Sequence, residues 1–182
     1  MLPSYDIRKL KNNRDFRTIV NTLYHEMGHV SDWCDYPNLY GIASNLDDGG
    51  EMCWTALFWI EYLAEKRSYT TGEDDKTALC SKFVEIQWHP YNYDMTYEKT
   101  NSFLYLNKVL PYFIVGTLDN DNYNRYMVQI GDALLKAYID ELRHELFELE
   151  KQLPFDAVEY LYGLNTIMKN YYDRFNGKYK LK

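Results

Sequence analysis

Segment 52–64 constrains the fold most, because it is apolar on almost every face of a helix. Its sequence, MCWTALFWIEYLA, contains only two clearly polar residues, Thr55 and Glu61. A helix that is apolar all round normally lies at the centre of a core rather than at the surface. We therefore predict a central helix from about Glu51 to Tyr69, ended by a Thr-Thr-Gly break, with other helices packed around it.

Helical periodicity governs the rest of the chain, and the alternation typical of strands is nearly absent. Gly and Pro number only 9 and 5 in 182 residues. The other predicted helices span about 13–35, 74–88, 97–116 (kinked or split at Pro111), 126–153 and 156–175, with loops at 37–50 and 91–97 and a turn at 119–124. The expected fold is therefore mainly α, a single compact domain over residues 1–182, with little or no β-sheet.

Charge and cysteine usage narrow the function classes. The net charge is −7, and because segments 1–24 and 169–182 carry +3 and +4, the middle carries −14. A general nucleic-acid binder would have a positive net charge.

No apolar run approaches the length of a membrane span, and the N-terminus has no apolar region typical of a signal peptide. Three cysteines without a pairing pattern indicate reduced thiols. We expect a cytoplasmic protein that binds neither nucleic acid nor membranes.

The sequence His25-Glu26-Met27-Gly28-His29 is an HExxH motif inside the helix predicted over 13–35. Histidines four residues apart lie on one helix face, so both imidazoles can reach one metal ion at about 2.0–2.1 Å. Glu26 is then placed toward a metal-bound water rather than the metal. The alternative is a surface helix with two solvated histidines.

The same helix carries an apolar stripe that predicts which face is buried. Tyr24, Met27 and Val30 are expected to pack inward, with His25 and His29 at the edge of the stripe. The stripe consists of Phe16, Ile19, Val20, Leu23, Tyr24, Met27 and Val30.

A catalytic zinc site needs a third protein ligand, and the central helix offers two carboxylates. Glu61 and Glu65 lie four residues apart on one face of an otherwise apolar helix. Buried carboxylates are costly unless they are paired, protonated or bound to metal. The alternative places both on an exposed edge beside Lys66 and Arg67.

HExxH followed by a helix with ExxxE resembles the gluzincin metallopeptidases. The forms HExGH and ExxAE are also similar to compact zincins of the ImmA/IrrE type, many of them carried on mobile elements. The resemblance covers about residues 14–69 and implies a zinc-site helix pair, supported by the helices of 70–182. It implies His25, His29 and Glu61 as zinc ligands, Glu26 as general base, Glu65 as the residue that orients a ligand histidine, and Ala64 as a small residue that lets the two helices approach.

Two further candidates stay open. The metzincin pattern would place its last ligand at Asp35, but it needs glycine at position 32, where this chain has Asp32. Glu61 is therefore favoured over Asp35 as the third ligand. His89 is either a donor to a developing oxyanion or a fixed loop histidine, and no tyrosine can be singled out for that task.

The expected function is a zinc-dependent metallopeptidase acting on a protein or peptide. One alternative is a non-catalytic helical binding module whose 126–153 helix, with Leu135, Leu142 and Leu149 at sevenfold spacing, pairs with a partner. Core packing explains that spacing equally well. Another alternative is the helical half of a larger zincin, because no clear strand pair precedes His25. The substrate and the oligomeric state are left open.

Overall fold

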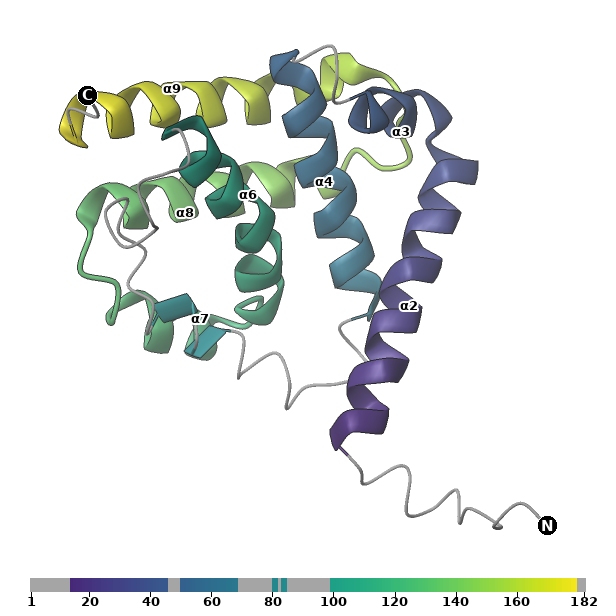
Figure 1. Ribbon diagram of the computed structural model, residues 1–182, viewed down its shortest axis with the longest axis horizontal. Coiled ribbons are helices and arrows are strands. Elements are labelled where there is room, and N and C mark those ends of the chain that lie inside the picture. The colour runs from purple at the N-terminus through teal and green to yellow at the C-terminus, as the bar shows by residue number, and fades with distance from the viewer. Residues whose placement is uncertain (1–13, 46–49, 69–79, 82, 85–98, 180–182) are drawn as a thin grey trace.

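The computed structural model describes residues 14–45, 50–68, 80–81, 83–84 and 99–179. Every regular element in these ranges is helical, which confirms the mainly α prediction (Figure 1). The elements are α2 (Arg14–Asp35), α3 (Pro37–Ser44), α4 (Glu51–Ser68), α6 (Lys99–Gly116), α7 (Asn120–Met127), α8 (Ala133–Glu150), the 3-10 helix η3 (Val158–Leu161) and α9 (Tyr162–Tyr179). No helix in the described ranges is long and apolar enough to cross a membrane.

Helix α4 occupies the centre, as its all-round apolar sequence predicts. It packs against α2 and α3 on one side and against α6, α9 and η3 on the others (Figure 1). Trp59 and Tyr62 of α4 are fully buried, and the Trp59 ring stacks on Phe155 at a centroid distance of 5.5 Å. Tyr138 of α8 stacks on Tyr171 of α9 at 4.7 Å. The core therefore lies between α4, α6, α8 and α9.

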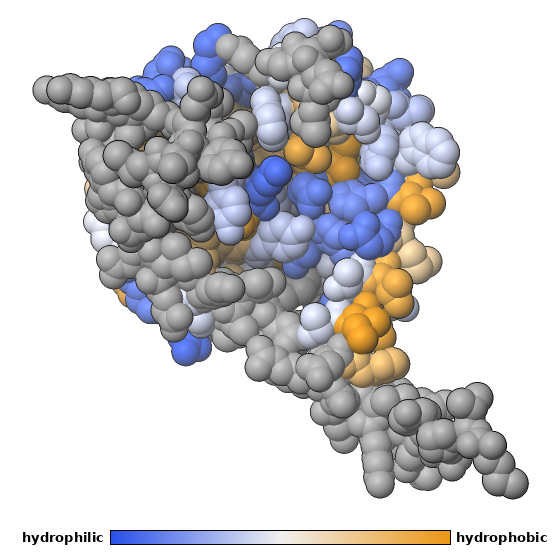
Figure 2. Space-filling model, in the orientation of Figure 1, coloured by the Kyte–Doolittle hydropathy of each residue, from blue (hydrophilic) through white to orange (hydrophobic). Residues whose placement is uncertain are grey.

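Helix α2 is turned differently from the prediction. Tyr24, Met27 and Val30, which the stripe predicts to pack inward, are all exposed, whereas His25 and Asp32 are buried. In Figure 2 the apolar side chains along α2 form an orange band at the surface. The prediction was wrong because it assumed that the apolar side of a helix faces its own core.

Helix α3 lies where the sequence predicted a loop from 37 to 50. Pro37 occupies the first turn, where its missing N–H costs nothing. The Asp156 carboxylate accepts hydrogen bonds from the backbone N–H groups of Asn38 and Leu39, both at 3.0 Å to Oδ1. A cap from 117 residues away therefore completes this helix.

The helix predicted over 126–153 is in fact two helices. Helix α7 begins inside the predicted 119–124 turn, where Asp119 Oδ1 caps the N–H of Asn122 at 2.8 Å. Helix α8 begins after Asp132, whose Oδ1 caps the N–H of Leu134 at 2.7 Å. An aspartate cap satisfies the free N–H groups at the start of a new helix. Asp132 therefore favours a separate helix α8 over a continuous helix from α7.

The remaining boundaries differ less. Helix α6 is continuous through Pro111, and the last predicted helix begins as η3 and extends as α9 to Tyr179. Of the predicted 74–88 helix, only 80–81 and 83–84 are described, and they are helical; the 91–97 loop and His89 lie outside the described residues. The apolar seam of α8 is buried in the core, so it is not a surface for a partner helix: Leu135, Ile139, Leu142, Leu146 and Leu149.

Candidate metal centre

Helices α2 and α4 approach closely at Gly28 and Ala64. A Cβ atom placed on Gly28 would lie 3.1 Å from the Cα and 3.2 Å from the Cβ of Ala64, which is tighter than ordinary contact. A side chain on Gly28 would therefore push the helices apart. This approach brings the His25 and His29 face of α2 against the Glu61 and Glu65 face of α4.

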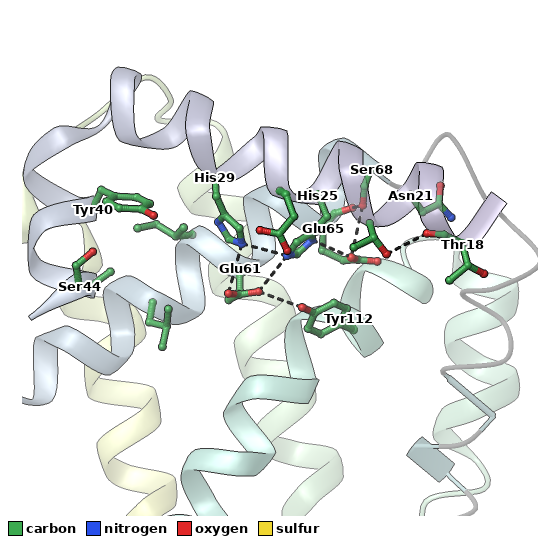
Figure 3. A pocket seen from close by; sticks show the side chains of 15 residues that line it. Thr18, Asn21, His25, His29, Tyr40, Ser44, Glu61, Glu65, Ser68 and Tyr112 are labelled. Atoms are coloured by element: carbon green, nitrogen blue, oxygen red, sulfur yellow. Dashed lines mark hydrogen bonds and ion pairs between the residues drawn. The ribbon is translucent and has the colours of Figure 1, made fainter. Parts of the chain in front are cut away.

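Three side chains converge on one point between these helices (Figure 3). The Nε2 atoms of His25 and His29 are 3.1 Å apart. Glu61 places Oε2 at 3.4 Å from His25 Nε2 and Oε1 at 3.5 Å from His29 Nε2. Donors around a tetrahedral zinc at 2.0–2.1 Å are separated by about 3.3 Å. The observed donor separations therefore fit zinc without rearrangement, and these three residues could hold a metal ion.

Glu65 lies behind His25 rather than at the centre of the group. Its Oε2 is 3.3 Å from Nδ1 of His25, the nitrogen that points away from the donors. Ser68 donates its hydroxyl to the Glu65 backbone carbonyl at 2.8 Å, and Oε2 of Glu65 lies 3.5 Å away. A carboxylate on the outer nitrogen of a ligand histidine fixes the tautomer that presents Nε2 to a metal. Glu65 thus lies where the resemblance implies.

Tyr112 of α6 is a part of the site that the sequence analysis missed. Its hydroxyl donates to Oε2 of Glu61 at 3.1 Å, and its ring stacks on His25 with centroids 5.7 Å apart and planes 21° apart. It comes from a third helix, 51 residues after Glu61. Nothing in the sequence distinguishes it from the other 18 tyrosines, because its role depends on how α6 packs on α4.

Burial and charge shape the protonation of this cluster in the absence of metal. Burial opposes a charge on His25, but the hydrogen bonds and charges of Glu61 and Glu65 outweigh it and raise the His25 pKa to about 9. Burial works against the Glu61 carboxylate, yet contacts with both histidines and Tyr112 lower its pKa overall. Burial, reinforced by Glu61, raises the pKa of Tyr112, so this hydroxyl keeps its proton and donates it. An ion entering the site must therefore displace a proton from His25.

The donors line a cavity of about 520 Å³ that is open to solvent. Glu26 is exposed and also lines this cavity, next to the two histidines. In Figure 3 Asn21 and Tyr40 mark opposite ends, with the donors between them. The cavity therefore extends to both sides of the donor group.

The other candidates lie apart from the donors. Asp35 is exposed, six residues beyond His29, and accepts a hydrogen bond from the Ser31 hydroxyl at 2.9 Å. It does not belong to the group of possible metal ligands in the described ranges. Asp32 is fully buried and forms an ion pair with Arg67, which also donates to the Gly28 carbonyl at 3.1 Å. Arg67 therefore ties α4 to α2 beside the site.

No family model, curated protein or solved structure matches this chain.

Proposed function

We propose that this protein is a mononuclear zinc peptidase, with His25, His29 and Glu61 as the metal ligands. The observation that carries the proposal is the donor geometry: two imidazole nitrogens and a carboxylate, 3.1–3.5 Å apart, at the wall of an open cavity. Three protein ligands beside open space are typical of catalytic zinc, whereas structural zinc is closed by four.

Zinc bound there would lower the pKa of a water and polarise the carbonyl of a substrate. The residues around it supply the proton transfers. The Glu26 carboxylate accepts a proton from the attacking water as the C–O bond forms, and then delivers it to the leaving amine as the C–N bond breaks. Glu65 holds His25 in the tautomer that binds through Nε2, and Tyr112 holds one oxygen of Glu61.

The open cavity on both sides of the donors supports an extended peptide as the substrate. The acidic middle of the chain favours a basic one, since a negative field attracts positive charge. We place the protein in the cytoplasm, because Cys34, Cys53 and Cys80 form no disulfide with one another, as is usual in a reducing compartment. Nucleic acid and membranes are not proposed as partners.

The test combines metal content with cleavage. Protein purified without added metal or a histidine tag is expected to hold about one zinc per chain and to cleave members of a peptide library. Glu61→Ala and His25→Ala should lose the zinc. Glu26→Gln should keep the zinc and lose cleavage, because the amide cannot accept the proton.

Asp35→Asn is the matched control, since Asp35 is an exposed carboxylate on the same helix. It should change neither zinc content nor cleavage. Loss of zinc in this variant would mean that Asp35, and not Glu61, is the third ligand. Cleavage retained by Glu26→Gln would refute the mechanism. Zinc uptake by the wild type without any cleavage would favour a non-catalytic metal-binding module instead.

A further inference from the structure

Helix α2 carries a row of apolar residues on its solvent side. We define the α2 seam as Phe16, Val20, Leu23, Met27, Val30 and Cys34, which repeat at intervals of four and three residues. Leu23, Met27 and Val30 are 57%, 65% and 60% exposed, and the flanking Ile19 and Trp33 are exposed as well. The apolar band along α2 in Figure 2 is this surface.

The seam lies opposite the metal centre. At about 100° per residue, Leu23 and Met27 are centred about 180° from His25 around the helix axis. The buried side of α2 is therefore polar or small, with His25, Gly28 and Asp32, and its exposed side is apolar. A partner on the seam would leave the cavity at the metal centre open.

The spacing of the residues in the seam predicts what kind of surface can pack against it. Apolar residues at alternating four- and three-residue intervals pack against another helix with the same spacing. The comparable seam of α8 is buried in the core. Large exposed apolar side chains elsewhere in the described ranges are scattered over separate elements: Tyr105, Val128, Tyr160 and Tyr162. Within the described part of the chain, α2 itself is thus the helix with a matching exposed seam.

The exposed area is close to what a dimer needs. The six most exposed apolar side chains of α2 each present about 100 Å², so the patch is on the order of 600 Å². Monomers rarely expose a larger apolar patch without a function. A standard interface takes about 800 Å² from each partner, and a two-fold pair of α2 helices would bury at most about 1,200 Å² in total from the patch alone. These six are Ile19, Leu23, Tyr24, Met27, Val30 and Trp33.

We propose that the protein forms a two-fold homodimer in which the α2 seams of two copies pack against each other. Each copy contributes the same helix, so the interface is isologous and closes at two chains. The metal cavities face away from the interface in both copies. The interface contains no metal ligand and leaves Glu26 outside it, because the seam and the metal ligands lie on opposite sides of α2.

Sedimentation equilibrium on the full chain tests the proposal. The wild type is expected to dimerise with a dissociation constant of about micromolar size, given an interface at the lower end of the specific range. Leu23→Glu should weaken the dimer at least about a hundredfold, because it places two charges in an apolar seam. Val128→Glu is the matched control: Val128 is 75% exposed and lies outside α2, so this variant should dimerise like the wild type.

Two outcomes would overturn the proposal. One is a wild type that remains monomeric at about 100 micromolar, well above the expected dissociation constant. The other is a Leu23→Glu variant that still dimerises. Circular dichroism and zinc content are measured on every variant, and both should match the wild type because Leu23 is exposed in the single chain. A monomeric variant with unchanged helix content then reports the interface and not the fold.

Discussion

Gly28→Ala tests whether the approach of α2 and α4 sets the metal affinity. The added Cβ would meet backbone and Cβ atoms of Ala64 at 3.1 and 3.2 Å, so α4 must move by a few tenths of an ångström. His25 and His29 lie on α2 and Glu61 on α4. The inter-helix donor separations, now 3.4 and 3.5 Å, would therefore grow by a similar amount.

Gly28→Ala should affect both the free energy of unfolding and the affinity for zinc. An alanine in a helix interior gains about 1 kcal/mol over glycine, whereas overpacking costs about 1–3 kcal/mol. The free energy of unfolding should therefore fall by at most about 2 kcal/mol. Metal sites tolerate only about 0.2 Å of error in their donor distances. We therefore expect zinc affinity to fall about tenfold or more, which corresponds to about 1.4 kcal/mol of binding free energy.

The assay is a competition titration with a zinc chelator, combined with chemical denaturation of the metal-free protein. Gly41→Ala is the matched control, because Gly41 lies in helix α3 and an added Cβ there meets nothing within 4 Å. It should gain up to about 1 kcal/mol and bind zinc like the wild type. If Gly28→Ala binds zinc within about twofold of the wild type, the close approach does not control the site.

Four further predictions concern the donors and the groups around them. Tyr112→Phe removes only the hydroxyl on Glu61; we expect zinc affinity to fall about tenfold and the visible spectrum of the cobalt-substituted protein to change, with helix content unchanged. Zinc binding at pH 7.5 should release about one proton, since the His25 pKa is about 9 in the metal-free cluster, and calorimetry in buffers of different ionisation enthalpy measures it. The raised pKa also predicts that His25 stabilises the metal-free protein fully below pH 6.5 and that this stability is lost as pH rises through about 9, visible in thermal melts. Arg67→Leu leaves Asp32 buried without its partner and should cost about 3 kcal/mol in denaturant unfolding.

The sequence predicted α2 and α4 well because both are long, α2 with an amphipathic pattern and α4 with apolar residues on almost every face. It also predicted the local geometry of the HExxH turn, because residues four apart on a helix share a face. The short helix α3 was missed because its cap, Asp156, comes from 117 residues away in the chain. The break before α8 had a readable signal in Asp132, a good N-cap, which the continuous apolar spacing masked.

In the candidate site, too, the sequence predicted local relationships better than contacts between distant segments. His25 and His29 are local in sequence, so their proximity was predictable, and Glu61 followed from the need for a third ligand. Tyr112 was not predictable, since it reaches Glu61 only through the packing of α6 on α4. The orientation of α2 was predicted wrongly, because an apolar stripe shows which side avoids water but not which molecule covers it.

The orientation of α2, with its apolar side toward solvent, leads to a prediction about metal removal. Helix α2 packs mainly on α4 and α3, and its buried side offers His25, Gly28 and Asp32 in place of apolar side chains. With little apolar area holding it to the core, α2 depends on its polar contacts, and a zinc ion bridging α2 to Glu61 would be the strongest of them. Chelation of zinc should therefore free α2 locally before the rest unfolds.

Hydrogen exchange read by mass spectrometry separates the two regions. After chelation at pH 7, the amides of α2 should exchange at least about tenfold faster, whereas those of α8, buried on its core side, should not change. Glu61→Ala without chelator should reproduce the same local effect. Equal acceleration in α2 and α8 would mean that zinc stabilises the whole fold, and no acceleration in α2 would mean that the ion does not link these helices. Because the proposed dimer also covers α2, the same exchange experiment should be carried out on the Leu23→Glu variant. There, chelation of zinc should accelerate the exchange of the α2 amides more than in the wild type.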